Sequence, residues 1–366
     1  MVDLRTNLCG LELRNPLVLA SGPLSYDGEA ILRAHRAGMA ATVTKTIRRD
    51  AARNPVPHIA RWNGGLLNSE KWSDLPARQW IEHEIPRAKD GGATVIASVG
   101  LDAKQVRLLA RALEMAGADA LEVCSYDASE TVPMVKTAVR EVGIPVLAKV
   151  SANWPNVVAV ATAALAAGSA GITAIDSVGP ALRFDIERRA PVVGGGVGWM
   201  SGSSIFPIAL RVVAQIADET GATIVGTGGV GSADEVIEMM MAGARAVGVC
   251  SQLMTIGLGA VERWVKALAD RLEGLGFSEA HEVVGAALPA WRAERDAVPF
   301  EELSAAFRWF SERCTQCGLC VRVCPYGART APDRVDGELC RYCGLCASAC
   351  PTAALHLRVA EDSTDG

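Results

Sequence analysis

Eight of the eleven cysteines in this 366-residue chain stand in its last sixth, in two runs of the same spacing. Each run reads C-x2-C-x2-C-x3-C-P, the spacing of thiolates that hold a pair of [4Fe–4S] clusters. In this pattern the fourth cysteine of a run reaches across to the other cluster, since the following proline turns the chain away. The predicted ligand sets are Cys314, Cys317, Cys320 and Cys350 for one cluster, and Cys340, Cys343, Cys346 and Cys324 for the other.

Two other interpretations of these cysteines fit less well. A zinc ribbon joins two C-x2-C pairs into one four-ligand site and leaves no use for eight cysteines. A disulfide scaffold needs an oxidising compartment, and the first thirty residues contain no apolar core of a signal peptide. We therefore expect a cytoplasmic protein whose C-terminal part transfers electrons to or from the part before it.

The composition is that of an enzyme with a sizeable core. Apolar residues make up 50% of the chain and charged residues 21%, and the formal net charge is −5. No basic cluster indicates a nucleic-acid surface. No stretch of 18 apolar residues runs without charges or breaking glycines, so we expect neither a nucleic-acid partner nor a membrane span.

Short apolar runs alternate with amphipathic helical patterns through the first 285 residues. Alternation of this kind predicts a parallel sheet, and eight units predict a (β/α)8 TIM barrel with its active site at the carboxyl ends of the strands. A doubly wound open sheet more often has five to seven strands. The predicted strands are 17–21, 41–46, 94–99, 120–124, 145–150, 171–176, 223–226 and 246–250, with helices such as 28–37, 103–116, 131–142, 155–167, 207–219 and 232–242.

The remaining segments complete the domain organisation. Two long excursions, 47–90 and 177–205, interrupt the barrel pattern at places where substrate sites are built. The predicted domains are a barrel over 1–285, a helical connector over 286–310, a small bacterial-type 2[4Fe–4S] ferredoxin domain over 311–358 and a disordered tail over 359–366.

The motif "GTGGVG", from Gly226 to Gly231, matches the G-x-G-x-x-G pattern of dinucleotide sites. It falls at the seventh strand, and no acidic residue ends the next one, so we do not expect a Rossmann site. In a barrel, the turns after strands seven and eight bind a phosphate through backbone N–H groups. Gly228, Gly229, Cys250 and Ser251 are therefore the predicted phosphate cradle of a mononucleotide.

Two lysines end otherwise apolar strands, Lys45 on the second and Lys149 on the fifth. Strand-end lysines opposite a phosphate cradle are suited to stabilising an anionic reduced flavin. The first strand ends in Ala20, Ser21 and Gly22, whose small side chains let a flat ring approach the backbone.

Several further motifs follow one another in a set order along the chain. The segments "NPLVLASG", "TKTI", "GGLLNSEKWSD", "DSVG", "GWMSG" and "GTGGVGSADEVIEMMMAGARAVGVCS" resemble the FMN barrel of the dihydroorotate dehydrogenase family. The attached double cluster motif resembles the dihydropyrimidine dehydrogenase branch. The resemblance implies FMN and two [4Fe–4S] clusters, a substrate contact at Asn68, and FMN contacts at Ala20, Ser21, Gly22, Lys45, Thr46, Lys149, Ser177, Gly202, Gly228, Gly229, Cys250 and Ser251.

The departures from the family pattern concern the substrate. Where the family has an "LNLSCPN"-type segment, this chain has "LEVCSYDAS", and the loop that follows is shorter. Cys124 replaces a flavin-contacting asparagine, while Tyr126 and Asp127 stand in place of a serine and the catalytic cysteine. Asp176 replaces a substrate-reading asparagine. The candidate catalytic residues are Asp127, Tyr126, Cys124 and Asp176, and Asp176 is also a candidate for substrate binding.

These replacements predict a changed substrate. A carboxylate offers only acceptors where an amide offers both a donor and an acceptor. Each buried polar group left unpaired costs about 1–3 kcal/mol, so two losses weaken binding of a dihydropyrimidine roughly 10²–10⁴-fold. Anionic dihydroorotate also meets Asp176. A substrate with an N–H group or a cationic nitrogen facing Asp176 fits better.

The sequence thus predicts an FMN- and iron–sulfur-dependent oxidoreductase acting on a C=C or C=N bond of a small, nitrogen-containing cyclic substrate. Without a nicotinamide domain it needs an electron partner, either a ferredoxin or a flavin subunit that oxidises NAD(P)H. Two alternatives stay open: an electron-transfer subunit of a larger complex, and a dihydropyrimidine dehydrogenase catalytic subunit. The oligomeric state, including a homo-oligomer, also stays open.

Overall fold

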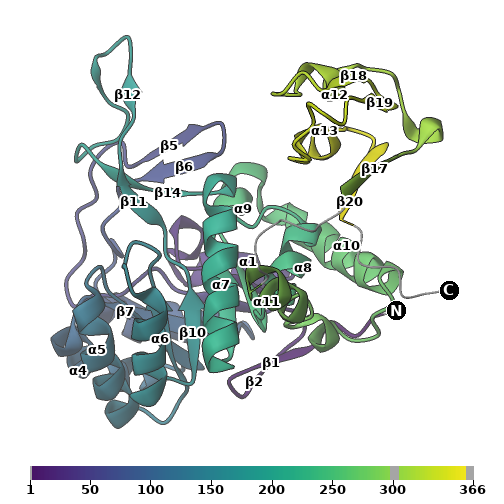
Figure 1. Cartoon of the computed structure of the whole chain (residues 1–366). Helices are drawn as coiled ribbons and strands as arrows, with labels where there is room; N and C mark the ends of the chain where they lie inside the picture. Colours follow the sequence, from purple (N-terminus) through teal and green to yellow (C-terminus); the bar gives the residue numbers. More distant parts are fainter. Residues whose placement is uncertain (1, 297–304, 360–366) are drawn as a thin grey trace. The chain divides into compact units, whose positions relative to one another are not determined.

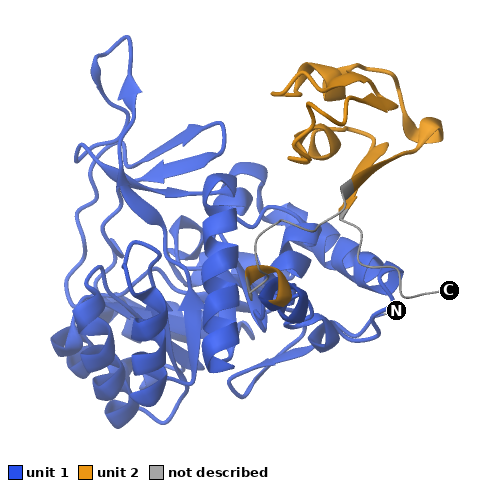
Figure 2. Ribbon diagram, in the orientation of Figure 1, with its two compact units in different colours: residues 1–292 blue, residues 293–366 orange. Residues whose placement is uncertain are grey.

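The computed structural model describes residues 2–296 and 305–359. The chain divides into two compact units, residues 1–292 and 293–366, shown in blue and orange in Figure 2. Each unit has its own secondary structure and is described separately. Among the described residues, no helix has the length and apolar character needed to cross a bilayer.

The first unit is built on a closed barrel of eight parallel strands, in the order β10-β15-β16-β3-β4-β7-β8-β9 (Figure 1). All eight predicted strands are present, so the TIM barrel prediction is confirmed. The motif from Gly226 to Gly231 follows a barrel strand and not a Rossmann strand. The bounds are β3 Leu17–Leu19, β4 Ala41–Val43, β7 Val95–Gly100, β8 Ala120–Cys124, β9 Val146–Val150, β10 Gly171–Ala174, β15 Ile224–Thr227 and β16 Ala246–Val249.

Helices follow the strands, and polar side chains mark where several of them begin. Asp27, Asp102 and Ser232 each accept a hydrogen bond from the first turn of the helix they precede, which satisfies backbone N–H groups that the helix leaves free. The helices are α1 Gly28–Arg36, α2 Ala77–Gln79, the π-helical turn η2 Trp80–Glu84, α3 Ile85–Asp90, α4 Ala103–Met115, α5 Ala128–Glu141, α6 Val157–Ala166, α7 Phe206–Thr220, α8 Ala233–Met241, α9 Ser251–Ile256, α10 Val261–Gly274 and α11 Leu288–Asp296.

At the amino ends of its strands, the barrel interior is closed by the N-terminal hairpin of β1 (Thr6–Leu8) and β2 (Leu11–Leu13). Leu8 and Leu13 pack into a buried cluster with inward residues of the barrel strands, such as Ile96 and Leu147. Side chains two residues further along a strand point to the same side. The inward positions therefore change from apolar to polar toward the carboxyl ends: Ile96 to Ser98, Ala120 to Glu122, Leu147 to Lys149 and Val225 to Thr227.

The two long excursions come together in a second sheet, which the sequence does not reveal. Its order is β11-β14-β6-β5, and β14 pairs antiparallel with β6 through Trp199 and Asn68. This sheet connects segments 130 residues apart beside the barrel mouth, and a further hairpin extends from it (Figure 1). The strands are β5 Ile59–Trp62, β6 Gly65–Asn68, β11 Val178–Ala181, β14 Gly198–Ser201 and, in the hairpin, β12 Phe184–Asp185 and β13 Ala190–Pro191.

The second unit contains the cysteine runs. A short helix lies inside each run, α12 (Leu319–Arg322) and α13 (Leu345–Ser348), and two antiparallel pairs frame them. The pairs are β17 (Ala305–Trp309) with β20 (Leu355–Val359), and β18 (Arg329–Ala331) with β19 (Arg334–Val335). Of the predicted helical connector over 286–310, Leu288–Asp296 is helical, whereas Ala305–Trp309 is a strand because it pairs with β20. Residues 297–304 lie outside the described residues, as do residues 360–366 of the predicted tail.

Candidate active site

The carboxyl ends of the barrel strands surround an open cavity of about 140 Å³. Nearly all the predicted contacts meet here. Among the residues that line it are Ala20, Ser21, Gly22, Asn68, Lys149, Asp176, Ser177, Gly228, Gly229, Cys250 and Ser251.

The turn after β15 is shaped by glycine. Gly229 has φ +82°, and a Cβ atom there would lie 2.4 Å from the backbone oxygen of Gly202. On the other side, a Cβ on Gly22 would lie 2.5 Å from Sγ of Cys250. Gly202 does not line the cavity, but its backbone oxygen packs against Gly229 in the turn. The close backbone approach and the two adjacent turns fit a phosphate held by main-chain N–H groups.

A second cavity of about 100 Å³ lies beside the first and shares several of its residues. Trp72, Tyr126 and Trp199 contribute aromatic surface, and the Tyr126 ring stacks on Trp199 with centroids 5.3 Å apart. The Tyr126 and Trp72 ring centroids are 4.9 Å apart. Charged and polar groups complete the lining: Ser21, Lys45, Thr46, Asn68, Glu70, Lys71, Cys124, Lys149, Asp176 and Ser177.

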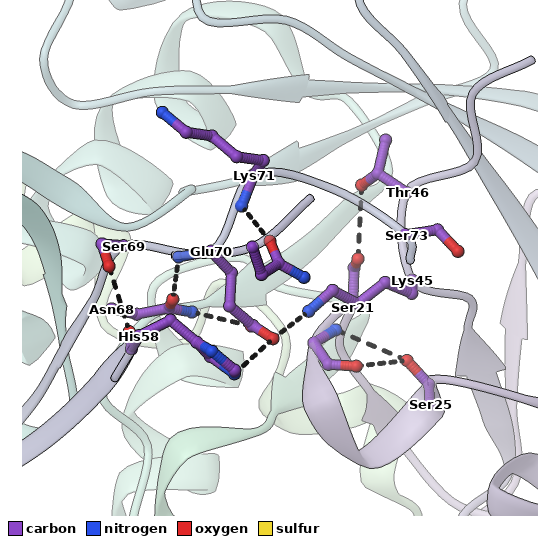
Figure 3. Close-up of polar contacts among 12 residues, drawn as sticks. Ser21, Ser25, Lys45, Thr46, His58, Asn68, Ser69, Glu70, Lys71 and Ser73 are labelled. Carbon is purple, nitrogen blue, oxygen red and sulfur yellow. Dashed lines mark hydrogen bonds and ion pairs between the residues drawn. The ribbon is translucent and has the colours of Figure 1, made fainter. Parts of the chain in front are cut away.

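Glu70 is the centre of a polar cluster in this second cavity. Its Oε1 atom lies 2.6 Å from Nζ of Lys45 and 3.5 Å from Nε2 of His58, and both side chains point to the carboxylate in Figure 3. Nδ2 of Asn68 donates to Oε2 of Glu70 over 3.1 Å. The Asn68 amide and the Lys45 ammonium are therefore both engaged by a residue for which the sequence analysis assigned no role.

A second carboxylate pairs with the other strand-end lysine. Nζ of Lys149 lies 3.4 Å from Oδ1 of Asp176. Burial disfavours the charged form of Lys149, but the carboxylates of Asp176 and Glu122 outweigh it and raise the pKa of Lys149 above its usual value. Lys149 therefore stays a cation throughout the physiological pH range.

Glu122 lies beneath the cavities and is 1% exposed. Ser98 donates to its Oε1 atom over 3.2 Å, and hydrogen bonds continue from Ser98 to Thr46 and from Thr46 to Ser21. Burial raises the pKa of Glu122, while the Lys149 charge acts in the opposite direction. The sequence analysis missed this residue, although a lone acid in an apolar strand is a signal that could have found it.

Cys124 and Asp176, two of the candidate catalytic residues, contact each other. Sγ of Cys124 donates to Oδ2 of Asp176 over 3.6 Å, and burial raises the pKa of this thiol well above its usual value. Tyr126 lines the same cavity, and its hydroxyl donates to the carbonyl of Lys71 over 3.5 Å. Desolvation, with a contribution from Asp176, raises the pKa of Tyr126 as well. Both groups therefore keep their protons at neutral pH.

Asp127 does not belong to this group. Its carboxylate caps helix α5 and accepts hydrogen bonds from the amide and hydroxyl of Ser129. These bonds hold the pKa of Asp127 below its usual range, and the side chain is exposed. A proton donor needs the opposite shift. The prediction that Asp127 is catalytic therefore has no support in its geometry.

In the second unit the eight cysteines line two separate cavities. Cys314, Cys317, Cys320 and Cys350 line one, called here the Cys314 cavity. The other, the Cys340 cavity, is lined by Cys324, Cys340, Cys343 and Cys346. Each cavity thus receives three cysteines of one run and the fourth of the other, as expected from the spacing. Among the described residues no group of three potential ligands is placed to hold a single metal ion.

Known proteins match both units. The family model described as "Dihydroorotate dehydrogenase" matches residues 119–272, and "4Fe-4S binding domain" matches residues 307–330 and 334–356. A Thermoplasma acidophilum protein named "Dihydroorotate dehydrogenase B (NAD(+)), catalytic subunit" is 32% identical over 303 residues, covering 79% of this chain and 100% of the relative. A Lactobacillus helveticus "Dihydroorotate dehydrogenase A (fumarate)" is 32% identical over 304 residues, covering 78% and 98%.

These matches confirm the predicted cofactors, FMN and [4Fe–4S] clusters, and an oxidoreductase that acts on CH–CH or CH–NH groups. The glycine turns, the two buried lysines and the two four-cysteine cavities are suited to those groups. The chain belongs to the dihydroorotate dehydrogenase family.

Proposed function

We propose that this flavin enzyme reduces or oxidises a C=C or C=N bond in a small cyclic substrate that presents nitrogen-bound hydrogen to the protein. The observation that carries this proposal is the pair of carboxylates, Glu70 and Asp176, facing one cavity with aromatic walls. Carboxylates accept hydrogen bonds and repel a substrate carboxylate. Tryptophan and tyrosine faces favour flat rings, and cationic rings most of all.

The charges in the cavity argue against dihydroorotate. Of the lysines that line the cavity, Lys45, Lys71 and Lys149, the buried Lys45 is already paired with Glu70 at 2.6 Å. Lys149 is likewise paired with Asp176. An anionic substrate would have to displace a buried carboxylate from its partner, and breaking such a pair costs about 3–5 kcal/mol. A neutral or cationic nitrogen heterocycle avoids this cost.

FMN, when bound, supplies hydride transfer to or from the substrate. We assign its phosphate to Gly228, Gly229, Cys250 and Ser251, and its ring to the region bounded by Ser21 and Lys149. Ala20, Gly22, Lys45, Thr46 and Ser177 complete the proposed contacts, whereas Gly202 acts through Gly229.

Proton transfer is assigned to the group around Asp176. Its Oδ2 atom accepts a hydrogen bond from the Cys124 thiol. The Asp176 carboxylate can therefore be hydrogen-bonded to Cys124 on one side and to the substrate on the other while it exchanges a proton with the substrate. Tyr126 places its ring against the substrate space and keeps its hydroxyl on the Lys71 carbonyl. We therefore propose Asp176 as the acid–base residue and Tyr126 as a positioning residue.

The electrons are proposed to pass singly between an external protein, the two clusters and FMN. Relatives such as the Thermoplasma acidophilum protein carry "catalytic subunit" in their names, which supports a separate partner for this chain as well. A ferredoxin and a flavin subunit that oxidises NAD(P)H are the two partner classes. The experiment is turnover of the purified holoenzyme with NADH or NADPH alone, where fast reduction of the flavin would contradict the need for a partner.

The substrate class is tested by anaerobic stopped-flow reoxidation of the reduced holoenzyme with orotate, uracil and protonated 3,4-dihydroisoquinoline, a flat cyclic imine. We expect the imine to reoxidise the flavin at least tenfold faster than orotate does, with uracil between them. Orotate as the fastest oxidant contradicts the proposal. Electron transfer only to a one-electron acceptor would favour the electron-transfer subunit instead.

The Asp176→Asn variant sharpens this test. It restores an amide donor facing the cavity, so we expect the Kd for uracil to fall by about 5- to 100-fold, the equivalent of one buried hydrogen bond. Flavin reoxidation by every substrate should become slower, because the acid–base carboxylate is lost. The preference for the imine should decrease in the same variant. Asp185→Asn removes a carboxylate from the β12–β13 hairpin, outside both cavities, and should leave both substrates unaffected.

A further inference from the structure

The two halves of the cluster unit are related by their sequence repeat but differ at one buried position. The residue four positions after the fourth cysteine is an alanine in both halves, Ala328 and Ala354, each almost fully buried. The next residue is Arg329 in the first half and Leu355 in the second, and these are 3% and 4% exposed. A charged and an apolar side chain thus occupy equivalent interior places.

The equivalent residues belong to different cavities. Arg329 lines the Cys340 cavity, whereas Leu355 lines the Cys314 cavity. The Arg329 guanidinium lies over the Phe307 ring, with Cζ 4.5 Å from the ring centroid. Its Nη1 atom donates to the carbonyl of Pro332 over 2.9 Å.

Two further donors of this guanidinium are unsatisfied. Nε and Nη2 of Arg329 are buried and have no hydrogen-bond partner among the described residues. Arginine stays charged at every physiological pH, and an isolated buried charge is costly. A counter-charge inside the same cavity would account for its burial, and a [4Fe–4S] cluster with four thiolates is such an anion. Leu355 offers neither charge nor donors to the other cluster.

A cation beside a cluster changes how readily the cluster takes an electron. Reduction by one electron increases the negative charge of the cluster, so a nearby cation and N–H donors stabilise the reduced form more than the oxidised form. Hydrogen bonds to the sulfurs and net charge are among the factors that set cluster potentials, together with solvent exposure. Exposure is similar for the two ligand sets, except that Cys346 is buried, which acts in the opposite direction.

We propose that Arg329 raises the reduction potential of the cluster in the Cys340 cavity above that of the cluster in the Cys314 cavity. A single electron from the external donor then resides on the cluster beside Arg329. This one-electron reduction makes the cluster more negative by one charge and requires no proton transfer and no change of bonds. Arg329 is a tuning residue and takes no part in the chemistry on the substrate. The inference depends on the cluster assignment and not on the substrate proposed above.

The experiment is a potentiometric titration of the anaerobic full-length holoenzyme, with the two clusters followed by EPR. In the wild type we expect two separate reduction steps. At the potential where the lower step is half complete, the higher-potential cluster should be at least tenfold more reduced than oxidised, equivalent to about 59 mV for one electron. Arg329→Leu makes the two halves alike at this position, so it should shift only the higher step downward and bring the two steps together.

The second variant, Arg329→Gln, removes the charge and keeps a polar side chain, and should give most of the same shift. Arg329→Lys keeps the charge but loses the fork of donors, so its shift should be smaller. Arg334→Gln is the matched control, because Arg334 is an exposed arginine of the same β18–β19 hairpin. It should leave both steps unchanged.

Iron and sulfide are counted in every variant. A shift of the lower step, or unchanged steps in Arg329→Leu and Arg329→Gln with full iron content, overturns the proposal. If both variants lose their iron, Arg329 is required for cluster assembly and the proposal is equally wrong. Flavin reoxidation by the substrate panel is a separate readout, so failure of the substrate proposal would leave this result intact.

Discussion

Nζ of Lys45 lies 2.6 Å from Oε1 of Glu70, and the two side chains are only 7% and 11% exposed. This pair lies at the mouth of the barrel, where Lys45 follows strand β4 and Glu70 follows the β6 strand of the excursion sheet. An ion pair removed from water in this way is sensitive to the loss of one partner, because the remaining charge stays buried.

Glu70→Gln should therefore destabilise the barrel by about 3–5 kcal/mol, since it leaves the Lys45 ammonium without its counter-charge. The double variant Lys45→Met/Glu70→Gln removes both charges and should recover most of that loss. The measurement is denaturant unfolding followed by release of flavin fluorescence, arranged as a double-mutant cycle. Glu29→Gln, which breaks the exposed pair with Arg36, is the control and should cost less than about 1 kcal/mol. A loss in the double variant equal to that in Glu70→Gln would contradict the coupling.

Gly229→Ala should abolish flavin retention. Its Cβ would meet the backbone oxygen of Gly202 at 2.4 Å, and φ +82° disfavours any L side chain. Gly231→Ala in the same loop is the control, because its Cβ would meet only the flexible ends of Glu235 and Gln252, at 3.3 Å or more. Flavin per chain after desalting distinguishes them: the control should stay near the wild-type ratio. Full flavin content in Gly229→Ala would show that the turn is not the phosphate cradle.

Tyr126 should act through its ring and not through its hydroxyl. Tyr126→Phe keeps the stacking with Trp199 and Trp72, so we expect kcat to change by less than about threefold, the scale of a hydrogen bond weaker than 1 kcal/mol. Tyr126→Ala removes part of the aromatic wall, and the loss of one aromatic contact with the substrate, about 0.5–1.5 kcal/mol, should raise KM about 2- to 13-fold. Steady-state kinetics with the best substrate of the panel decides this. A large fall in kcat for Tyr126→Phe, with KM unchanged, would instead identify the hydroxyl as a proton donor.

Asp127→Ala should affect stability and not catalysis. Loss of a helix N-cap costs about 1 kcal/mol, and the carboxylate lies outside both cavities. Asp102→Ala removes the equivalent cap of α4 and should behave in the same way. Thermal unfolding and turnover are measured on the same samples. A fall in turnover of tenfold or more in Asp127→Ala alone would return this residue to the catalytic group.

Glu122 should make the barrel less stable as the pH rises. Its pKa is raised in the folded state by burial, whereas in the unfolded chain it titrates near about 4.3. Between these two values the folded state binds more protons than the unfolded state, so stability decreases with increasing pH across that interval. Glu122→Gln has no such group, and its unfolding free energy relative to the wild type should rise with pH. Unfolding curves from about pH 5 to pH 8 test this, and a pH-independent difference would show that Glu122 is charged in the folded state.

Local patterns were sufficient for the architecture and for the grouping of the eight cysteines. Apolar strand runs separated by amphipathic helices specify a parallel sheet, because hydrophobic periodicity is encoded in consecutive residues. The cysteine runs are equally local, and their spacing predicted the crossed arrangement of the two cavities. Gly229 could be placed for the same reason, since its role depends on the turn in which it stands.

The substrate side of the site was decided by tertiary structure. Glu70 meets Lys45, and Trp199 meets Tyr126, only because two excursions far apart in the chain pair in one sheet across the barrel mouth. The sequence pattern places Asp127 at a catalytic position, whereas in the folded chain its carboxylate caps helix α5. The sequence likewise shows that Arg329 and Leu355 differ. Only the folded structure shows that both are buried against the cysteine cavities. An unpaired charge has a large effect there, because water no longer screens it.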